Sequence, residues 1–250
     1  MASLSDSLIH ELKEMRLTTE KWASPLSIQV NNLLDENEMR EYLDLLGKHI
    51  EAANSKTAGS IFMKRYAFLA VMFLYTMTSK NEKLLISEEN ISIETDEKAE
   101  VWLPAFYFSR LESERLWKDR KAWRKNCIEA LFKDHLYPLI HCVAKVTKIS
   151  KLILWENIAI YIFWLYETVF QREENDFELN EKAKDDFQYI VFEAEGSLFG
   201  DYHENPLKRF YKEKMYVKEI DKEIRQRSSC CFAYLTKSKQ HCSTCPCMKI

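Results

Sequence analysis

Cysteine is concentrated at the carboxyl end of this chain. Five of its seven cysteines fall within the last 21 of 250 residues, in the order Cys230, Cys231, Cys242, Cys245 and Cys247. Globular cores use cysteine singly, as a small apolar residue, whereas thiolates at C-x-x-C spacing are typical ligands of metals and iron–sulfur clusters. We therefore expect two parts: a body over residues 1–220 and a metal-binding tail over residues 221–250.

Four interpretations of the cysteine tail are open: coincidence, disulfides, structural zinc and an iron–sulfur cluster. A bridge between adjacent cysteines is strained. The start of the chain, residues 1–6, has no secretion signal, so we expect a reducing cytosol. Zinc needs four ligands around one ion, and the adjacent Cys230 and Cys231 do not easily point at one ion. A two-iron cluster spreads its ligand positions over a larger object, so the spacing favours iron–sulfur and leaves zinc as the alternative.

The charges around the cysteines agree with an anionic centre. After Glu223 the chain contains no acidic residue, and its basic residues are Arg225, Arg227, Lys237, Lys239 and Lys249. Positive charge near thiolate ligands offsets the charge of a cluster and raises its reduction potential. We expect Cys247, which follows the C-x-x-C pair across Pro246, to be a spare thiol.

The composition of the body excludes several classes of protein. Apolar residues make up 46% and charged residues 30%, as in an ordinary globular protein. The four glycines form neither a dinucleotide-binding motif nor a P-loop. A net charge of −3 gives no general attraction to nucleic acid, and none is expected as a partner. The apolar stretch 152–170 contains Glu156, Asn157 and Glu167, which predicts a buried helix rather than a membrane span.

Apolar periodicity predicts a fold that is mainly α with a small antiparallel β-sheet, an α+β class. Ser5 and Asp35 are expected to cap the first two helices. Further helices are expected near residues 60–78, 112–147 with a break at Pro138, 152–170, 181–198 and 207–216. A small β insert is expected near 84–108: a hairpin of 84–87 with 91–94, and a third strand at 101–108 that Pro104 places at an edge or bulge.

The tail motif, Cys-Cys followed by ten residues and Cys-x-x-Cys, resembles that of the FhuF-like ferric-siderophore reductases. The resemblance implies a 2Fe–2S cluster whose iron is bound by Cys230, Cys231, Cys242 and Cys245, with Cys247 outside the motif. Three body segments are also similar to elements shared with the related IucA/IucC-like proteins: residues 135–140, 154–157 and 205–211.

The resemblance implies a cytoplasmic oxidoreductase that passes one electron to a bound Fe(III)-siderophore of hydroxamate or citrate type and releases Fe(II). Fe(II) binds hard oxygen donors more weakly than Fe(III), so one electron suffices. No nucleotide or flavin site is evident. An external donor, such as a ferredoxin, a flavodoxin or a reductase, is therefore implied, as is transient contact with a siderophore importer at the inner face of the membrane.

A polar, anionic chelate suits a pocket of basic and aromatic side chains. The candidate substrate-binding residues are Lys64, Arg65, Arg110, Lys208 and Arg209. The basic and aromatic residues between 110 and 125 form a second candidate wall. The alternative function is a zinc- or cluster-containing regulatory or interaction protein without reductase activity.

Overall fold

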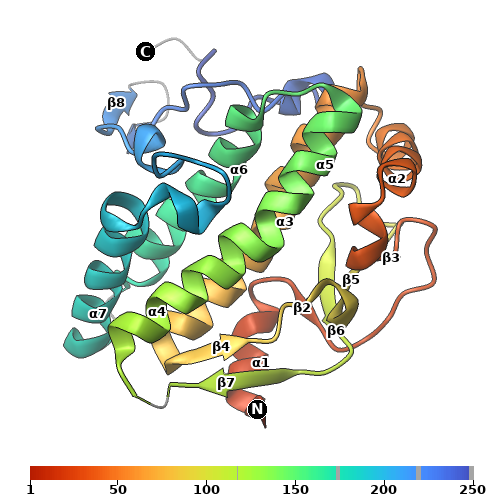
Figure 1. The fold of residues 1–250 in the computed structure, drawn as a ribbon. Coiled ribbons are helices and arrows are strands. Elements are labelled where there is room, and N and C mark those ends of the chain that lie inside the picture. The colour runs from red at the N-terminus through yellow and green to blue at the C-terminus, as the bar shows by residue number, and fades with distance from the viewer. Residues whose placement is uncertain (117, 173–174, 218–220, 248–250) are drawn as a thin grey trace.

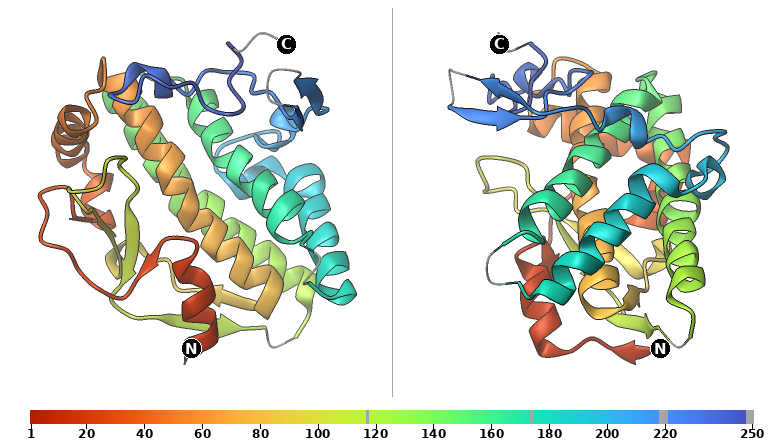
Figure 2. Two further views of the ribbon diagram at one scale, coloured as in Figure 1. Left: turned by 180° about the vertical axis from the view of Figure 1, so that it is seen from behind. Right: turned by 90° about the vertical axis from the view of Figure 1, so that its left-hand side faces the viewer.

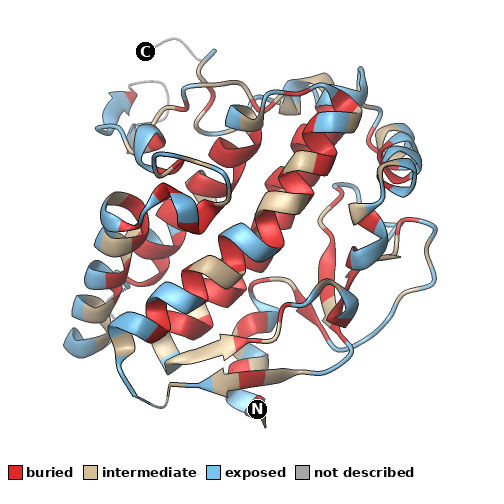
Figure 3. Ribbon diagram, in the orientation of Figure 1, coloured by how far each residue is buried: buried red, intermediate tan, exposed pale blue. Residues whose placement is uncertain are grey.

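The computed structural model describes residues 1–116, 118–172, 175–217 and 221–247. Helix α3, Ser55–Lys80, runs through the middle of the molecule and is buried along most of its length (Figures 1 and 3). It begins at Asn54, whose side chain accepts a hydrogen bond from Thr57 N at 3.0 Å, and it ends at Asn81, which adopts a left-handed conformation. A helix with apolar residues on every side needs neighbours all round.

Those neighbours are the other helices. They are α2 (Glu36–His49), α5 (Tyr137–Thr147), α6 (Lys151–Trp164) and α7 (Phe177–Gln188), with α1 (Asp6–Lys13) and α4 (Arg120–Glu129) near the opposite end from the tail (Figures 1 and 2). The expected caps are confirmed: Ser5 Oγ accepts from Leu8 N at 3.3 Å, and Asp35 Oδ1 accepts from Asn37 N at 2.8 Å.

Three π-helical segments continue α4, α6 and α7: Ala130–Leu136, Leu165–Val169 and Tyr189–Glu193. The first joins α4 to α5 without a break in the helical path. Pro138 lies in the first turn of α5, where it is tolerated, so the expected interruption takes the form of a π segment just before it.

Two expected helices are wrong in extent. Residues Glu112–Arg115 are strand β7, paired with β1 (Ala2–Ser3) and β4 (Glu82–Leu84), so the helix begins only at Arg120. The last expected helix shrinks to a 3-10 turn at Lys208–Phe210, followed by β8 (Met215–Val217) and β9 (Lys222–Ile224). In β7 the side chain of Ser113 is buried, and the charged residues on either side of it are not. This alternation of buried and exposed residues covers too few positions to distinguish a strand from a helix in the sequence.

The expected hairpin is also wrong. Strand β5, Ile91–Glu94, pairs with β6, Ala105–Phe108, instead of with β4. The buried side chain of Asn90 explains the change, since its amide group donates to Leu85 O and Arg110 O and accepts from Arg110 N at 2.8 Å. Asn90 therefore joins the β4–β5 connection to the end of β6.

The strand order of the larger sheet is β2-β6-β5-β3, with β2 at Leu17–Thr18 and β3 at Ile28–Gln29. β6 is therefore an inner strand, and the edge placement expected from Pro104 is wrong. Pro104 immediately precedes the strand, so its missing N–H removes no ladder hydrogen bond. The β2–β6 pair is parallel, so this sheet is mixed. The fold class is otherwise as expected, mainly helical with small sheets.

Two helical segments, Ser55–Lys80 and Lys151–Val169, are apolar and long enough to cross a membrane. In their most apolar windows, 89% and 61% of the residues are buried inside the body. Core helices of globular proteins share this length and composition, so neither segment is assigned to a membrane on this property. The cysteine tail crosses one end of the helix bundle, over the ends of α3 and α6 (Figure 2).

Candidate functional site

A buried carboxylate on α6 holds the start of the tail. Glu156 is 1% exposed, and its two carboxylate oxygens accept hydrogen bonds from Ser228 N at 2.5 Å and Ser229 N at 2.9 Å. The Ser229 hydroxyl also donates to it. Backbone N–H groups that converge on a carboxylate fix the local path of the chain, because a buried carboxylate without partners is costly.

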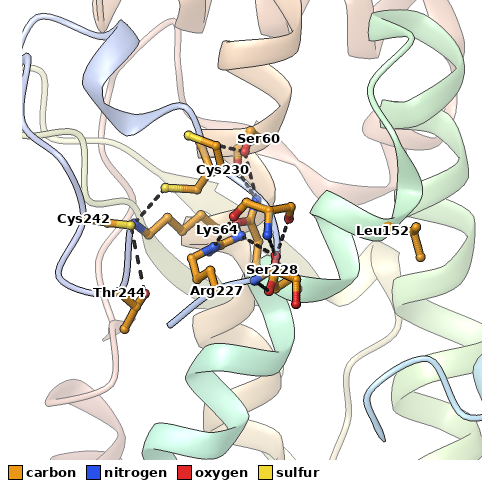
Figure 4. Close-up of polar contacts among 12 residues, drawn as sticks. Ser60, Lys64, Leu152, Arg227, Ser228, Cys230, Cys242 and Thr244 are labelled. Carbon is orange, nitrogen blue, oxygen red and sulfur yellow. Dashed lines mark hydrogen bonds and ion pairs between the residues drawn. The ribbon is translucent and has the colours of Figure 1, made fainter. Parts of the chain in front are cut away.

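A second polar group joins α3, α6 and the tail. Asn157 donates through Nδ2 to Ser60 O at 2.9 Å, and its Oδ1 accepts from Arg227 Nη2 at 2.7 Å. Ser60 Oγ in turn donates to the backbone carbonyl of Cys231 at 2.9 Å. The side chains of all these residues are buried. The vicinal cysteines are thus positioned by the two helices at the centre of the body (Figure 4).

The five tail cysteines lie together in two groups. Cys242 lies next to Cys231, and Cys247 lies next to both Cys230 and Cys245. Cys231 and Cys245 are buried, Cys230 and Cys242 are partly exposed, and Cys247 is exposed. The other two cysteines, Cys127 and Cys142, are buried in the body as single apolar residues, as expected.

Backbone N–H groups point at the cysteine sulfurs. Phe232 N donates to Cys230 Sγ at 3.3 Å, and Cys247 N donates to Cys245 Sγ at 3.4 Å. Ala233 N is a donor to Cys231. Such N–H···S bonds stabilise negative charge on sulfur and are one of the means by which proteins tune cluster potentials.

Positive charge also approaches the sulfurs. Lys64 is 8% exposed, and its Nζ lies 3.6 Å from Cys231 Sγ (Figure 4). The neighbouring Cys242 thiol lowers the pKa of Cys231, and the charges of Lys64 and Arg227 act in the same direction. The same interaction raises the pKa of Cys242. A positive charge next to a sulfur favours the thiolate, which is the form that binds a metal.

His241 is a further neighbour of the sulfurs. Its Nδ1 lies 3.2 Å from Cys245 Sγ, and its ring stacks on Tyr234 with 5.0 Å between centroids. Of the tail cations, Arg225 pairs with Glu167 on the extension of α6. Lys239 is exposed, and Lys249 lies outside the described residues.

The donor set is compatible with a dinuclear cluster. Among the described residues, no group of three His, Cys, Asp or Glu side chains is placed to hold a single metal ion. The two groups of thiols, with N–H donors to their sulfurs, would suit a centre that takes its ligands in pairs. Within the described residues, Arg227 Nη1 is buried without a hydrogen-bond partner.

The five candidate substrate residues lie in three places. Lys64 and Arg65 line a cavity of about 480 Å³ beside the tail. Lys208 and Arg209 line another, of about 1050 Å³, between the start of α6 and residues 192–206. Arg110 is exposed on the β6–β7 connection and lines neither of these cavities.

Much of the second basic wall is structural. Arg120 and Arg124 form short ion pairs with Asp186, which is fully buried on α7. Arg115 pairs with Glu82, and Lys125 lies 3.8 Å from Glu195. Trp117, also part of that wall, lies outside the described residues. Arg120 and Arg124 therefore join α4 to α7 and are not available to a ligand.

Comparison with models of known protein families shows the family of this chain. The family model described as "Ferric iron reductase FhuF-like transporter" matches residues 60–217. The chain belongs to the FhuF-like ferric iron reductase family. The match covers α3 through β8 and ends before the cysteine tail, so it is independent of the cysteine motif. A ferric reductase requires an iron substrate and a source of electrons. The search among curated proteins found no match.

Sequence reasoning missed the residues that hold the tail of this FhuF-like chain. Ser60, Glu156 and Asn157 were not recognised as its anchors. The available signal was a carboxylate and an amide side by side in the most apolar helix, where burial demands partners. His241 was missed because one histidine beside a cysteine carries little information in a sequence.

Proposed function

We propose that this FhuF-like protein is a cytoplasmic ferric-siderophore reductase whose tail holds a 2Fe–2S cluster through Cys230, Cys231, Cys242 and Cys245. The observation that carries the proposal is the gathering of these thiols against α3 and α6 in a chain whose body matches ferric iron reductases. When bound, the cluster supplies a one-electron carrier at the surface of the body.

The residues around the sulfurs have distinct roles. Lys64 and Arg227 place positive charge next to the thiolates, which favours the more negative, reduced state. The N–H groups of Phe232, Ala233 and Cys247 act in the same direction. Glu156 and Asn157 hold the tail fixed, so that the site changes little in shape when its charge changes.

The substrate is an Fe(III) chelate of hydroxamate or citrate type. Fe(III) is held by hard oxygen donors, and Fe(II) is held by the same donors far more weakly, so that transfer of one electron releases the iron. The partners of the protein are the chelate and an external donor, which is a ferredoxin, a flavodoxin or a separate reductase. Contact with a siderophore importer at the inner face of the membrane would bring the chelate to the protein.

A single-turnover experiment tests this function. Protein purified anaerobically is reduced chemically, freed of reductant and mixed with an Fe(III) chelate in the presence of an Fe(II)-specific chromophore. We expect one Fe(II) per protein and loss of the reduced spectrum at the same rate. A Cys245→Ser variant should release none, and a Cys247→Ser variant should behave as the parent. A colourless protein with stoichiometric zinc and no labile sulfide would instead support the regulatory alternative.

A further inference from the structure

A cavity separates α3 from the loop that joins the two pairs of tail cysteines. It has a volume of about 480 Å³, within the range of small-molecule sites. Ile61, Lys64 and Arg65 line it from α3, Trp102 from the β5–β6 connection, and Ala233 and Lys237 from the tail. We refer to it as the α3–tail cavity.

This cavity shares a wall with the cysteine site. Lys64 lines the cavity, and its Nζ lies 3.6 Å from Cys231 Sγ. Ala233 also lines the cavity, and its N–H is directed at Cys231. A molecule in the cavity is therefore one side chain away from a proposed cluster ligand.

The loop that closes the cavity is held in place. Lys237 N donates to Ile50 O at 2.9 Å, and Ala53 N donates to Leu235 O at 3.0 Å. These bonds tie the loop between Cys231 and Cys242 to the connection of α2 and α3. The cavity is thus formed by the fold and does not require a ligand to assemble it.

The charge of the cavity is positive. Lys64, Arg65 and Lys237 contribute three cations, and Glu100 contributes one carboxylate. Within the part of the chain that the structure describes, none of the three cations forms an ion pair with a carboxylate. Among the described residues, Arg65 donates one long hydrogen bond, to Tyr161 Oη at 3.4 Å, and its Nε is buried without a partner. A guanidinium without a carboxylate partner suits a carboxylate-bearing ligand.

The cavity of about 1050 Å³ is less suited to this role. Lys151, Lys208 and Arg209 line it together with Glu195 and Glu204, which leaves a smaller excess of positive charge. None of its lining residues lies in the tail over residues 221–250, so it shares no wall with the cysteines.

We infer that the α3–tail cavity binds an anionic, carboxylate-rich Fe(III) chelate of the citrate class in preference to a trihydroxamate chelate. Three singly charged hydroxamate groups neutralise Fe(III) and leave no net charge. Citrate-class ligands carry further carboxylates and give a negative complex, which Arg65 and Lys237 pair with directly. The inference rests on the proposed function for the identity of the metal, and the binding itself needs no electron transfer.

Ga(III) chelates test the inference, because Ga(III) has the charge and ligand preference of Fe(III) and is not reduced. Titration calorimetry on the full chain would compare Ga(III)-citrate with a Ga(III)-trihydroxamate. We expect citrate to bind at least about tenfold more tightly, the effect of one charge-assisted hydrogen bond. Its affinity should also fall as salt is raised.

Three substitutions in the cavity separate the cations from the carboxylate. Arg65→Gln and Lys237→Gln should each weaken Ga(III)-citrate binding by about tenfold, and Glu100→Gln should strengthen it. Lys184→Gln, at an exposed lysine that lines neither cavity, is the matched control and should leave the affinity unchanged. Lys237 is exposed, so its substitution keeps the test valid if the Arg65 variant does not fold.

Equal or tighter binding of the trihydroxamate would overturn the inference, as would unchanged citrate affinity in both cation variants. The proposed function fails separately. A protein that lacks iron and labile sulfide but binds Ga(III)-citrate through Arg65 and Lys237 would contradict the reductase assignment and leave the anion site intact. A protein that has a reducible cluster, and that loses chelate binding only in a Lys208→Gln variant, would support the reductase assignment. It would also place the chelate in the cavity lined by Lys208 instead of the α3–tail cavity.

Discussion

Lys64 Nζ lies 3.6 Å from Cys231 Sγ, although the two residues are far apart in the sequence. This contact joins the central helix to the cysteine tail and places a buried cation at the edge of the proposed cluster. It also explains why Lys64, a candidate for substrate binding, lies in the wall between the sulfurs and the α3–tail cavity.

Removal of the Lys64 charge should make the cluster harder to reduce. Lys64→Met keeps the apolar stem and deletes the cation, so the reduced state loses a stabilising charge. We expect the midpoint potential to fall by on the order of 60 mV, a tenfold change in a one-electron equilibrium. A potentiometric titration followed by electron paramagnetic resonance measures this. Lys121→Met, on exposed α4, is the control, and an equal shift in both variants would show that the contact has no specific effect.

Loss of the Glu156 carboxylate should free the tail. Glu156→Gln replaces a charged acceptor of two backbone N–H groups by a neutral one, which costs about 1–3 kcal/mol of docking. The expected result is faster proteolytic cleavage near Ser228 and faster bleaching of the cluster, with the helical signal of the body unchanged. Glu195→Gln is the matched control, since Glu195 is an exposed carboxylate away from the tail. Equal cleavage rates in the two variants would refute an anchoring role.

Asp186 should contribute to the stability of the body and not to the chemistry of the tail. Its carboxylate binds Arg120 and Arg124 and accepts a hydrogen bond from Thr78 Oγ1 at 2.9 Å. Asp186→Asn leaves two arginines short of charge compensation, so we expect a loss of about 3–5 kcal/mol in the free energy of unfolding. Urea denaturation measures this loss. Asp185→Asn, at a more exposed neighbour, should cost much less.

Acid should destabilise the body through His135. Its ring is buried and bonded to Tyr66 Oη at 2.7 Å, and burial lowers its pKa to about 4. The unfolded chain therefore binds a proton at this site near pH 6.5, whereas the folded chain does not bind one until about pH 4. Its contribution is complete above pH 6.5 and is lost as the pH falls toward 4, by up to about 3 kcal/mol.

Unfolding free energies measured across that interval check the sign. His135→Gln removes the titrating group, so the part of the slope due to His135 should disappear in this variant. Glu88 lies 3.7 Å from His135 Nδ1, and a Glu88→Gln variant should increase the acid sensitivity by removing the charge that favours protonation. An unchanged slope in the His135 variant would contradict this account.

The sequence predicted features that depend on local chemistry. Ser5 and Asp35 cap their helices as expected, because a cap is decided by a few adjacent residues. The strand at 112–115 was mistaken for helix, because Ser113 is ordered by pairing with Ala2, at the other end of the body chain. Long-range pairing leaves no periodic signal in so short a segment.

In the candidate site, too, local sequence predicted some features and long-range packing determined others. The spacing of the cysteines indicated that they act together, and in the structure the five tail cysteines lie next to one another. Of the candidate substrate residues, Lys64 and Arg65 line the cavity beside the tail, whereas Lys208 and Arg209 line another and Arg110 lies on the β6–β7 connection. The anchors Glu156 and Asn157 act on residues about 70 positions away. That contact depends on how α6 packs against the tail, which local sequence does not determine.

The most direct test of the central claim is the composition and spectrum of protein purified without oxygen. The account predicts about two irons and two labile sulfides per chain. It also predicts visible charge-transfer bands that bleach on reduction. Cys242→Ser and Cys245→Ser should lose these bands with the body still folded, and Cys247→Ser should retain them. A colourless parent protein that binds one zinc per chain, or a Cys245→Ser variant with an unchanged spectrum, would contradict the account.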